Sequence, residues 1–315
     1  MCSTFFVLMF SHPQKDQKVS NPNANNRTMK NNHFSAVLLA AISALAFSAA
    51  GQPIKVNCAE PVQSLSQSWA SNYGAKHPET KIEVTGGSAP AAFSALAGKK
   101  SQLAIALRSM RYPEAQECEA AFGQRAQEFK LAVNGVAVYV HASNPVKDLT
   151  YKEIEAVFQG KVRDWRRLGV NAGAIVALGM ATNTPAGDLF GEEVLGGKGL
   201  APEVRIVGAA ELMAMLASET NAIAFGPLAQ AKDVRAIEIR RANSSTPVSP
   251  TEETISNRIY PISRFVFGYT DPTANHAGLK DYLDWIRSDE GQQVARKAGY
   301  FQLSAKWRGG SESRP

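Results

Sequence analysis

The strongest constraint on the fold is the alternation of short apolar runs with amphipathic segments from residue 53 onward. The first apolar runs have the length and composition of strands and lie at 54–57, 81–86 and 102–107. Helices are predicted between them at 61–73 and 90–97. This βαβα order favours a parallel sheet with helices on its faces, so the predicted fold class is α/β.

The same alternation continues toward the C-terminus. The run 131–140 is apolar throughout, and we expect one long strand buried on both sides. Thr150 and Glu153 form the pattern of a capping box, which predicts a helix at 151–159. Further strands and helices follow, and residues 304–315 are expected to form a disordered tail.

The N-terminal 50 residues read as a leader. Residues 30–50 combine a basic start, an apolar run and small residues, the pattern of a secretory signal peptide cleaved after Ala50. Translation is expected to start at Met29, and the mature protein is expected to be exported to the periplasm. Residues 1–50 hold four of the 34 basic and one of the 28 acidic residues, so the mature chain has a formal charge of +3. This excess is too small to indicate nucleic-acid binding.

Two cysteines remain after removal of the leader, Cys58 and Cys118. An even number of cysteines in an exported chain is compatible with a disulfide, and two free thiols in a core are the alternative. The sequence leaves both open.

Three predicted strand ends point to a ligand site. In a parallel α/β sheet, ligands bind at the carboxyl ends of the strands. These ends fall at Asn57–Cys58–Ala59, at 86–89 and at 107–109. Ser88 and Pro90 give the second end the character of a helix start, where backbone N–H groups attract anions. Arg108 follows the third strand, and its planar fork suits an oxyanion, although a solvated arginine is the alternative.

The stretch TNTPAGDLF (182–190) predicts a second helix start of the same kind. Thr184 supplies a capping oxygen, and Pro185 fits the first helical position because its missing N–H would have no partner there. The small Ala186 leaves room for a ligand near the backbone. Ser88, Ala89, Thr184, Pro185 and Ala186 are therefore predicted ligand-binding residues, although most helix starts bind only water.

Catalytic chemistry finds little support in the sequence. The mature histidines are His77, His141 and His276, and none has a second ligand at metal spacing. No nucleophile and base pair stands out either. We expect no enzyme, no metal and no cofactor.

Three segments resemble the periplasmic phosphate-binding protein family. They are NGVAVYVHASNPVKDLTYKEIEAVFQGKVRDW (134–165), YPISRFVF (260–267) and SDEGQQVARKAGYFQL (288–303). The resemblance implies a type II periplasmic binding fold with the ligand closed between two lobes. Lobe 1 would comprise 51–145 plus 258–303, and lobe 2 would comprise 146–257. It also implies delivery of phosphate to the permease of an ABC transporter, and we expect a monomer.

The family's ligand motifs are only partly kept in the first lobe. Gly87 and Ser88 match the family's first loop, but Ala89–Pro90 replaces its next glycine. Leu107–Arg108 stands where the family has Ser-Arg, and Gln102 stands where an acidic residue is usual.

The second lobe departs further from the family. Met180 takes the place of an arginine, and Thr184–Pro185–Ala186 takes the place of Ser-Gly-Thr. Two hypotheses therefore stay open. The first is a transport receptor for phosphate or a related small oxyanion. The second is a protein of the same fold that has lost phosphate and acts in envelope sensing, adhesion or assembly.

Overall fold

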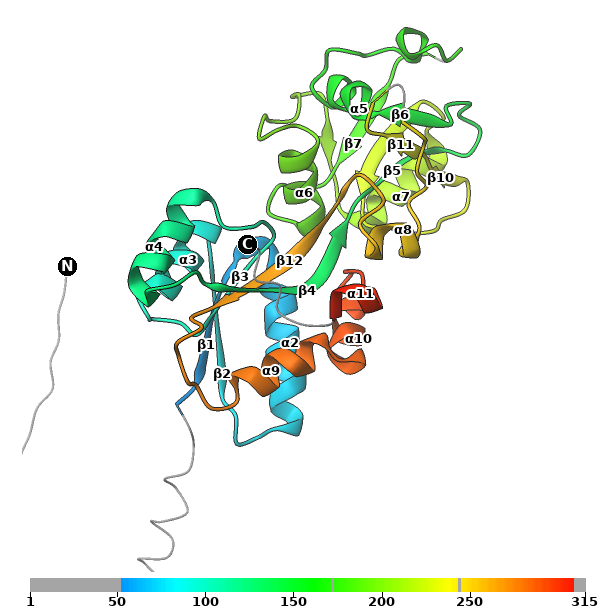
Figure 1. Ribbon diagram of the computed structural model, residues 1–315. Coiled ribbons are helices and arrows are strands. Elements are labelled where there is room, and N and C mark those ends of the chain that lie inside the picture. The colour runs from blue at the N-terminus through cyan, green and yellow to red at the C-terminus, as the bar shows by residue number, and fades with distance from the viewer. Residues whose placement is uncertain (1–51, 172, 243–244, 309–315) are drawn as a thin grey trace, which may run out of the picture. The chain divides into compact units, whose positions relative to one another are not determined.

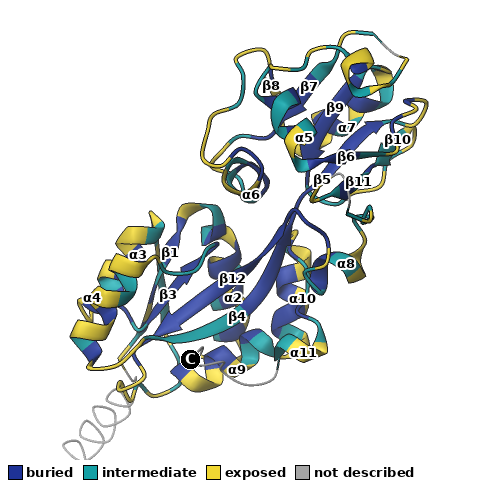
Figure 2. Cartoon of the chain, turned by 45° about the horizontal axis from the view of Figure 1, so that its top comes forward, coloured by how far each residue is buried: buried dark blue, intermediate teal, exposed yellow. Residues whose placement is uncertain are grey.

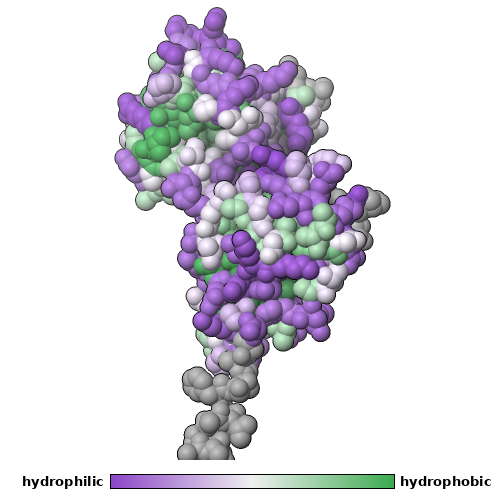
Figure 3. Space-filling model, turned by 90° about the vertical axis from the view of Figure 1, so that its left-hand side faces the viewer, coloured by the Kyte–Doolittle hydropathy of each residue, from purple (hydrophilic) through white to green (hydrophobic). Residues whose placement is uncertain are grey.

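A computed structural model describes residues 52–171, 173–242 and 245–308 of the chain. The predicted signal peptide, the start at Met29 and the cleavage after Ala50 lie outside these residues, as do 309–315 of the predicted tail. Within the described ranges, no helix is long and apolar enough to cross a membrane. Most of the surface seen in Figure 3 is hydrophilic, with smaller apolar areas between the polar ones.

The described chain forms two five-stranded sheets and one small two-stranded sheet (Figure 1). The first sheet has the order β2 (Ile82–Gly87), β1 (Ile54–Ala59), β3 (Leu103–Ala106), β12 (Ser263–Thr270), β4 (Gln127–Gly135). The second has the order β10 (Val234–Ala236), β5 (Ala137–His141), β9 (Ala222–Gly226), β7 (Val176–Gly179), β8 (Arg205–Ile206). The small sheet pairs β11 (Glu238–Arg240) with β6 (Asp148–Thr150).

Both large sheets mix parallel and antiparallel pairs. In the first, β1 runs parallel to β2 and β3, whereas β12 runs antiparallel to β3 and β4. In the second, β7 runs parallel to β8 and β9, whereas β5 runs antiparallel to β9 and β10. The predicted α/β class is confirmed, and the antiparallel strands are those next to the points where the chain passes from one sheet to the other.

Helices cover both faces of the first sheet. On one face lie α2 (Gln63–Lys76), α9 (Leu279–Arg287) and α10 (Asp289–Lys297), and on the other lie α3 (Ala89–Ala97) and α4 (Tyr112–Phe122). Figure 2 shows β3 and β12 buried and the outer sides of these helices exposed. Burial of two apolar faces is what stabilises such a three-layer arrangement.

The second sheet is accompanied by α5 (Tyr151–Phe158), α6 (Pro185–Glu193) and α7 (Ala209–Ser218). Helix α8 (Glu252–Ser256) lies against β4 of the first sheet. The predicted capping box is confirmed at the start of α5, where Thr150 Oγ1 accepts a hydrogen bond from the Glu153 N–H at 3.3 Å. In the core beneath them Phe190 and Phe225 stack face to face, and Phe158 packs edge-on against both. Two short 3-10 turns, η1 (Glu60–Val62) and η2 (Trp165–Leu168), also occur.

The prediction of one strand over 131–140 is wrong. Strand β4 ends at Gly135 and β5 begins at Ala137, and the two belong to different sheets. At Gly135 a Cβ would come within 2.6 Å of Ile255 Cγ2, so the backbone passes too close to α8 for a side chain. The run is buried throughout, as expected, but it passes from the first sheet to the second at Val136.

The predicted disordered tail is wrong for its first residues. Residues Ala305–Arg308 form a short helix, α11, whose last carbonyl accepts a hydrogen bond from Arg287 Nη2 at 2.6 Å. Trp307 packs edge-on against Phe265, and the Lys130 ammonium lies 4.0 Å from its ring centroid. Aromatic and cation–π contacts therefore hold this segment to the first sheet.

The structure decides against a disulfide, because Cys58 and Cys118 are both free and buried. Cys58 belongs to the core beneath α2 and α9, whereas Cys118 belongs to the core beneath α3 and α4. The first sheet lies between these two cores, which is why the thiols cannot meet.

Candidate functional site

A cleft of about 450 Å³ lies at the carboxyl ends of the parallel strands of the first sheet. Each of these strands contributes residues at its C-terminal end or directly after it. The lining residues are Ala59, Glu60, Pro61, Gly87, Ser88, Ala89, Pro90, Leu107, Arg108, Arg111, Thr182, Asn183, Asp188, Glu192 and Arg264. The cleft thus joins three strand ends of the first sheet to α6 and the loop before it.

The start of α3 supplies backbone N–H groups to this cleft. Ser88 caps the helix as predicted, its Oγ accepting a hydrogen bond from the Ala91 N–H at 3.2 Å. Pro90 has no N–H, and the N–H of Ala92 bonds to the Ser88 carbonyl. The N–H of Ala89 is therefore the first-turn donor without an acceptor inside the helix.

Arg108 lies in the cleft with its guanidinium held in place. Glu114 of α4 accepts two hydrogen bonds from it, at 2.7 Å from Nη1 and 2.6 Å from Nη2. Nη1 also donates to the Ser109 carbonyl, and the guanidinium carbon lies 5.3 Å from the Phe93 ring centroid. Three of the five N–H groups of the guanidinium are used, so two remain for a ligand.

The pairing also fixes the charge state of Glu114, whose side chain is 13% exposed. Burial raises the pKa of this carboxyl, but hydrogen bonds from Arg108 and from the Arg111 N–H outweigh burial and lower the pKa below its ordinary value. Glu114 is therefore ionised at neutral pH and compensates the charge of Arg108.

Arg264 is a cleft residue that the sequence-based prediction missed. It lies in β12, its side chain is 6% exposed, and its Nη2 pairs with the carboxylate of Asp188 in the first turn of α6. Its Nε is buried and has no hydrogen-bond partner among the described residues. The sequence did hold a signal for it, an arginine within the apolar segment YPISRFVF. A charged side chain in a buried strand is rarely without a partner, so such an arginine indicates an ion pair or a ligand.

The predicted start of α6 exists, but its donors and acceptors are already used. Thr184 Oγ1 donates to the Ala181 carbonyl at 2.6 Å and accepts from the Gly187 N–H at 3.1 Å. The Pro185 carbonyl accepts a hydrogen bond from Asn134 Nδ2 at 2.8 Å, and Ala186 is buried. None of the three predicted residues Thr184, Pro185 and Ala186 lines the cleft.

Two exposed residues just before them line it instead, Thr182 and Asn183. Their side chains carry a hydroxyl and an amide, so they restore some of the hydrogen-bonding capacity that the start of α6 lacks.

Asn57 and Cys58 also lie outside the cleft lining. The Cys58 side chain points into the α2 core, and its Sγ donates to the Thr85 carbonyl at 3.6 Å. Asn57 is half-buried within β1, between Thr85 and Ala104 of the neighbouring strands. The residues that reach the cleft from this strand end are Ala59, Glu60 and Pro61.

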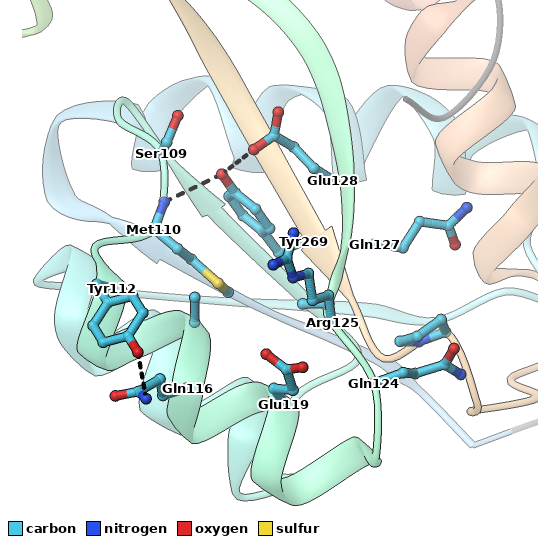
Figure 4. Close-up of a pocket in the computed structure, with 13 residues that line it drawn as sticks. Ser109, Met110, Tyr112, Gln116, Glu119, Gln124, Arg125, Gln127, Glu128 and Tyr269 are labelled. Carbon is cyan, nitrogen blue, oxygen red and sulfur yellow. Dashed lines mark hydrogen bonds between the residues drawn. The ribbon is translucent and has the colours of Figure 1, made fainter. Parts of the chain in front are cut away.

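A larger cavity of about 690 Å³ lies beside α4 and the beginning of β4 (Figure 4). There Tyr269 donates from its hydroxyl to Glu128 Oε2 at 2.6 Å and accepts from the Met110 N–H at 3.2 Å. Its charged lining residues are Glu119, Arg125 and Glu128. It reaches Tyr112 at the start of α4, but among the described residues it contains no arginine that is paired with a carboxylate. We therefore place the candidate site in the smaller cleft, where strand ends, a helix start and two held arginines meet.

No group of three or more potential ligand side chains that could hold a metal ion occurs in the part of the chain that the structure describes.

Two α/β units joined by two chain crossings, with a polar cleft at the strand ends, define the class as the type II periplasmic binding fold. Residues 13–290 match the family model of the PBP superfamily domain. The chain belongs to this superfamily.

Several proteins similar to this chain are named phosphate-binding proteins. The chain is 25% identical over 264 residues to the phosphate-binding protein PstS of Pseudomonas aeruginosa, covering 78% of this chain and 82% of that one. An ABC-type phosphate transport receptor from Vibrio cholerae is 23% identical with a TM-score of 0.66, covering 79% of this chain and 99% of that one. A possible phosphate binding protein from Planctomyces limnophilus is 23% identical with a TM-score of 0.72, covering 82% and 95%. The predicted resemblance to phosphate-binding proteins is confirmed.

Proposed function

We propose that this protein is an exported solute receptor that binds phosphate or a related small oxyanion in the cleft and delivers it to the permease of an ABC transporter. One observation carries the proposal. The start of α3 and the guanidinium of Arg108, which Glu114 holds in place, both lie in the cleft at the carboxyl ends of neighbouring strands. The phosphate-binding relatives support the same ligand class.

The physical requirement is replacement of the anion's water. Phosphate carries about two charges near neutral pH, and its desolvation is costly unless several donors replace the lost hydrogen bonds. The cleft offers the Ala89 N–H, the two remaining N–H groups of Arg108 and the side chains of Thr182 and Asn183. Because Arg108 is held by Glu114, it loses little conformational freedom when it binds a ligand.

In this proposal the lobes are the two large sheets with their helices, and the ligand lies between them. Strand β5 belongs to the second sheet, so the first boundary moves from residue 145 to Val136. The receptor is a periplasmic monomer, and its domain arrangement allows the two lobes to close on a ligand.

A second function is favoured by the start of α6. The hydroxyl of Thr184 is bonded within the loop, and the side chain of Met180 offers no charge where the family has an arginine. A protein that kept the fold and lost phosphate would show these features, and it would act in envelope sensing, adhesion or assembly.

Thermal unfolding of the purified protein separates the two functions. The protein is first denatured and refolded to remove bound ligand, then heated with and without millimolar phosphate, sulfate or organic anions. A ligand at about 100 times its Kd stabilises by about 2.7 kcal/mol, which raises the Tm by several degrees. Under the receptor proposal, phosphate or another oxyanion raises the Tm.

Two variants test where such a ligand binds. Arg108→Gln should abolish the shift, whereas Arg125→Gln, in the larger cavity, should retain it. If the protein unfolds cooperatively and no anion changes its Tm, the result would support the second function, in which phosphate binding has been lost.

A further inference from the structure

Both held arginines of the cleft are already neutralised by carboxylates. Glu114 binds Arg108 through two hydrogen bonds, and Asp188 pairs with Arg264. A bound anion therefore meets two ion pairs rather than two free positive charges. Ion pairs of this kind still donate hydrogen bonds, but they supply little net attraction for a dianion.

The other charged side chains of the cleft make its net charge negative. They are Arg111, Glu60 and Glu192, all exposed. Neither glutamate has an ion-pair partner within residues 52–308 as far as these are described. With the two ion pairs counted as neutral, one positive and two negative charges leave the cleft at −1.

The unpaired carboxylates come from two elements that meet at the cleft. Glu60 opens η1, the turn after β1, and Glu192 lies in the last turn of α6, which packs against η1. The Glu192 carboxylate is close enough to the Arg108 guanidinium to help the Glu114 hydrogen bond raise the pKa of that arginine. Negative charge and fixed anion donors thus lie within reach of one small ligand.

Arg264 adds a second observation on the same cleft. Its side chain is 94% buried, since 6% is exposed, yet its Nε–H has no acceptor among the described residues. A buried donor left unsatisfied costs free energy, and a ligand oxygen would remove that cost. The cleft volume, about 450 Å³, lies in the range of small-molecule sites of ~300–1,000 Å³ rather than of a pocket closed around one tetrahedral ion.

We propose that the ligand is a zwitterion that joins an oxyanion to an ammonium group, such as an aminoalkyl phosphate ester or phosphonate. The oxyanion binds at Arg108 and the α3 start, and the ammonium group binds between Glu60 and Glu192. The inference rests on the proposed receptor function and specifies the substrate class of that cleft.

Calorimetric titration of the refolded, ligand-free protein tests it with three probes: phosphoethanolamine, ethyl phosphate and inorganic phosphate. The first two share a phosphate ester and a two-carbon chain and differ in the ammonium group. Phosphoethanolamine should bind about tenfold more tightly than ethyl phosphate, the gain expected from two partly exposed charge pairs.

The double variant Glu60→Gln/Glu192→Gln should remove this preference without weakening ethyl phosphate. Both residues are exposed, so their replacement leaves the core intact. Glu193→Gln is the matched control, because Glu193 is exposed on the same helix and does not line the cleft.

The outcomes separate this inference from the receptor proposal. Equal binding of phosphoethanolamine and ethyl phosphate, or a preference that survives in the double variant, overturns the zwitterion and leaves an oxyanion receptor. Binding of none of the three probes overturns the zwitterion and the choice of phosphate, and the thermal unfolding with sulfate and organic anions then decides whether the cleft is an oxyanion receptor at all.

Discussion

Arg264 in β12 pairs with Asp188 in the first turn of α6, so an ion pair joins a strand of the first sheet to a helix beside the second sheet. Asn134, the partner of Arg264 in the register of β4 and β12, donates to the carbonyl of Pro185 in the same turn. Two neighbouring polar side chains in otherwise apolar strands therefore hold the start of α6 beside the candidate cleft.

Replacing Asp188 should expose the cost of this arrangement. Asp188→Ala leaves Arg264 as a charged group that is 6% exposed and unpaired, and removing one partner of a buried ion pair costs about 3 kcal/mol. Thermal unfolding should show a Tm lower by several degrees. Lys280→Ala, which breaks the exposed pair with Asp284, is the control and should leave the Tm unchanged. An equal effect of the two substitutions would mean that the Arg264 pair is not buried in solution.

Glu114 gives the protein a dependence on acid pH. Its pKa in the folded protein lies below the ordinary value of 4.5. Its stabilisation is therefore fully present above about pH 4.5 and is lost as the pH falls through the folded-state pKa. Urea unfolding of the wild type and Glu114→Gln should show a difference in free energy of unfolding that shrinks from pH 6 toward pH 3. The exposed Glu119→Gln on the same helix controls for loss of a charge, and a difference for Glu114 that stayed constant with pH would contradict the pairing with Arg108.

The start of α6 should depend on a glycine. At Gly187 a Cβ would lie 2.0 Å from the Ala181 carbonyl oxygen, so Gly187→Ala must displace the backbone turn that Thr184 closes. We expect a loss of about 2 kcal/mol or more in denaturant unfolding. Gly191→Ala in the same helix has nothing within 4 Å and should stabilise by about 0.5–1 kcal/mol. Similar changes for both would rule out this close approach.

The two core thiols should behave as free cysteines. Burial raises the pKa of Cys58, and burial followed by the nearby Glu117 raises that of Cys118 to about 11. In protein lacking residues 1–50, a thiol reagent at pH 8 should react slowly with the folded state, because the thiolate is the nucleophile. In denaturant without reductant, mass spectrometry should find both cysteines labelled. Labelling that required prior reduction would demonstrate a disulfide.

Much of the local structure could be predicted because it depends on neighbours in the sequence. The caps at Ser88, Thr150 and Thr184 are each closed by a bond to a residue three positions on. Such bonds form wherever the pattern occurs, whatever surrounds the helix. The alternation of apolar runs likewise indicated the first three strands, β1, β2 and β3, and the α/β class.

The tertiary structure alone decided how these elements serve the cleft. The run 131–140 has one apolar pattern, yet it divides between two sheets at Val136, since burial on both faces is satisfied equally by either core. Thr184 was predicted to face a ligand, but its capping bonds turn its hydroxyl toward its own loop.

The charged residues of the cleft likewise depend partly on the local sequence and partly on the tertiary structure. The sequence placed Arg108 at a strand end, and only the fold brought Glu114 to neutralise it. Arg264 and Asp188 are 76 positions apart, so no local pattern could pair them. Side-chain hydrogen bonds within a helix start are determined by the local sequence. Ion pairs between elements depend instead on where packing places whole strands and helices. These ion pairs determine the net charge that a ligand meets in the cleft.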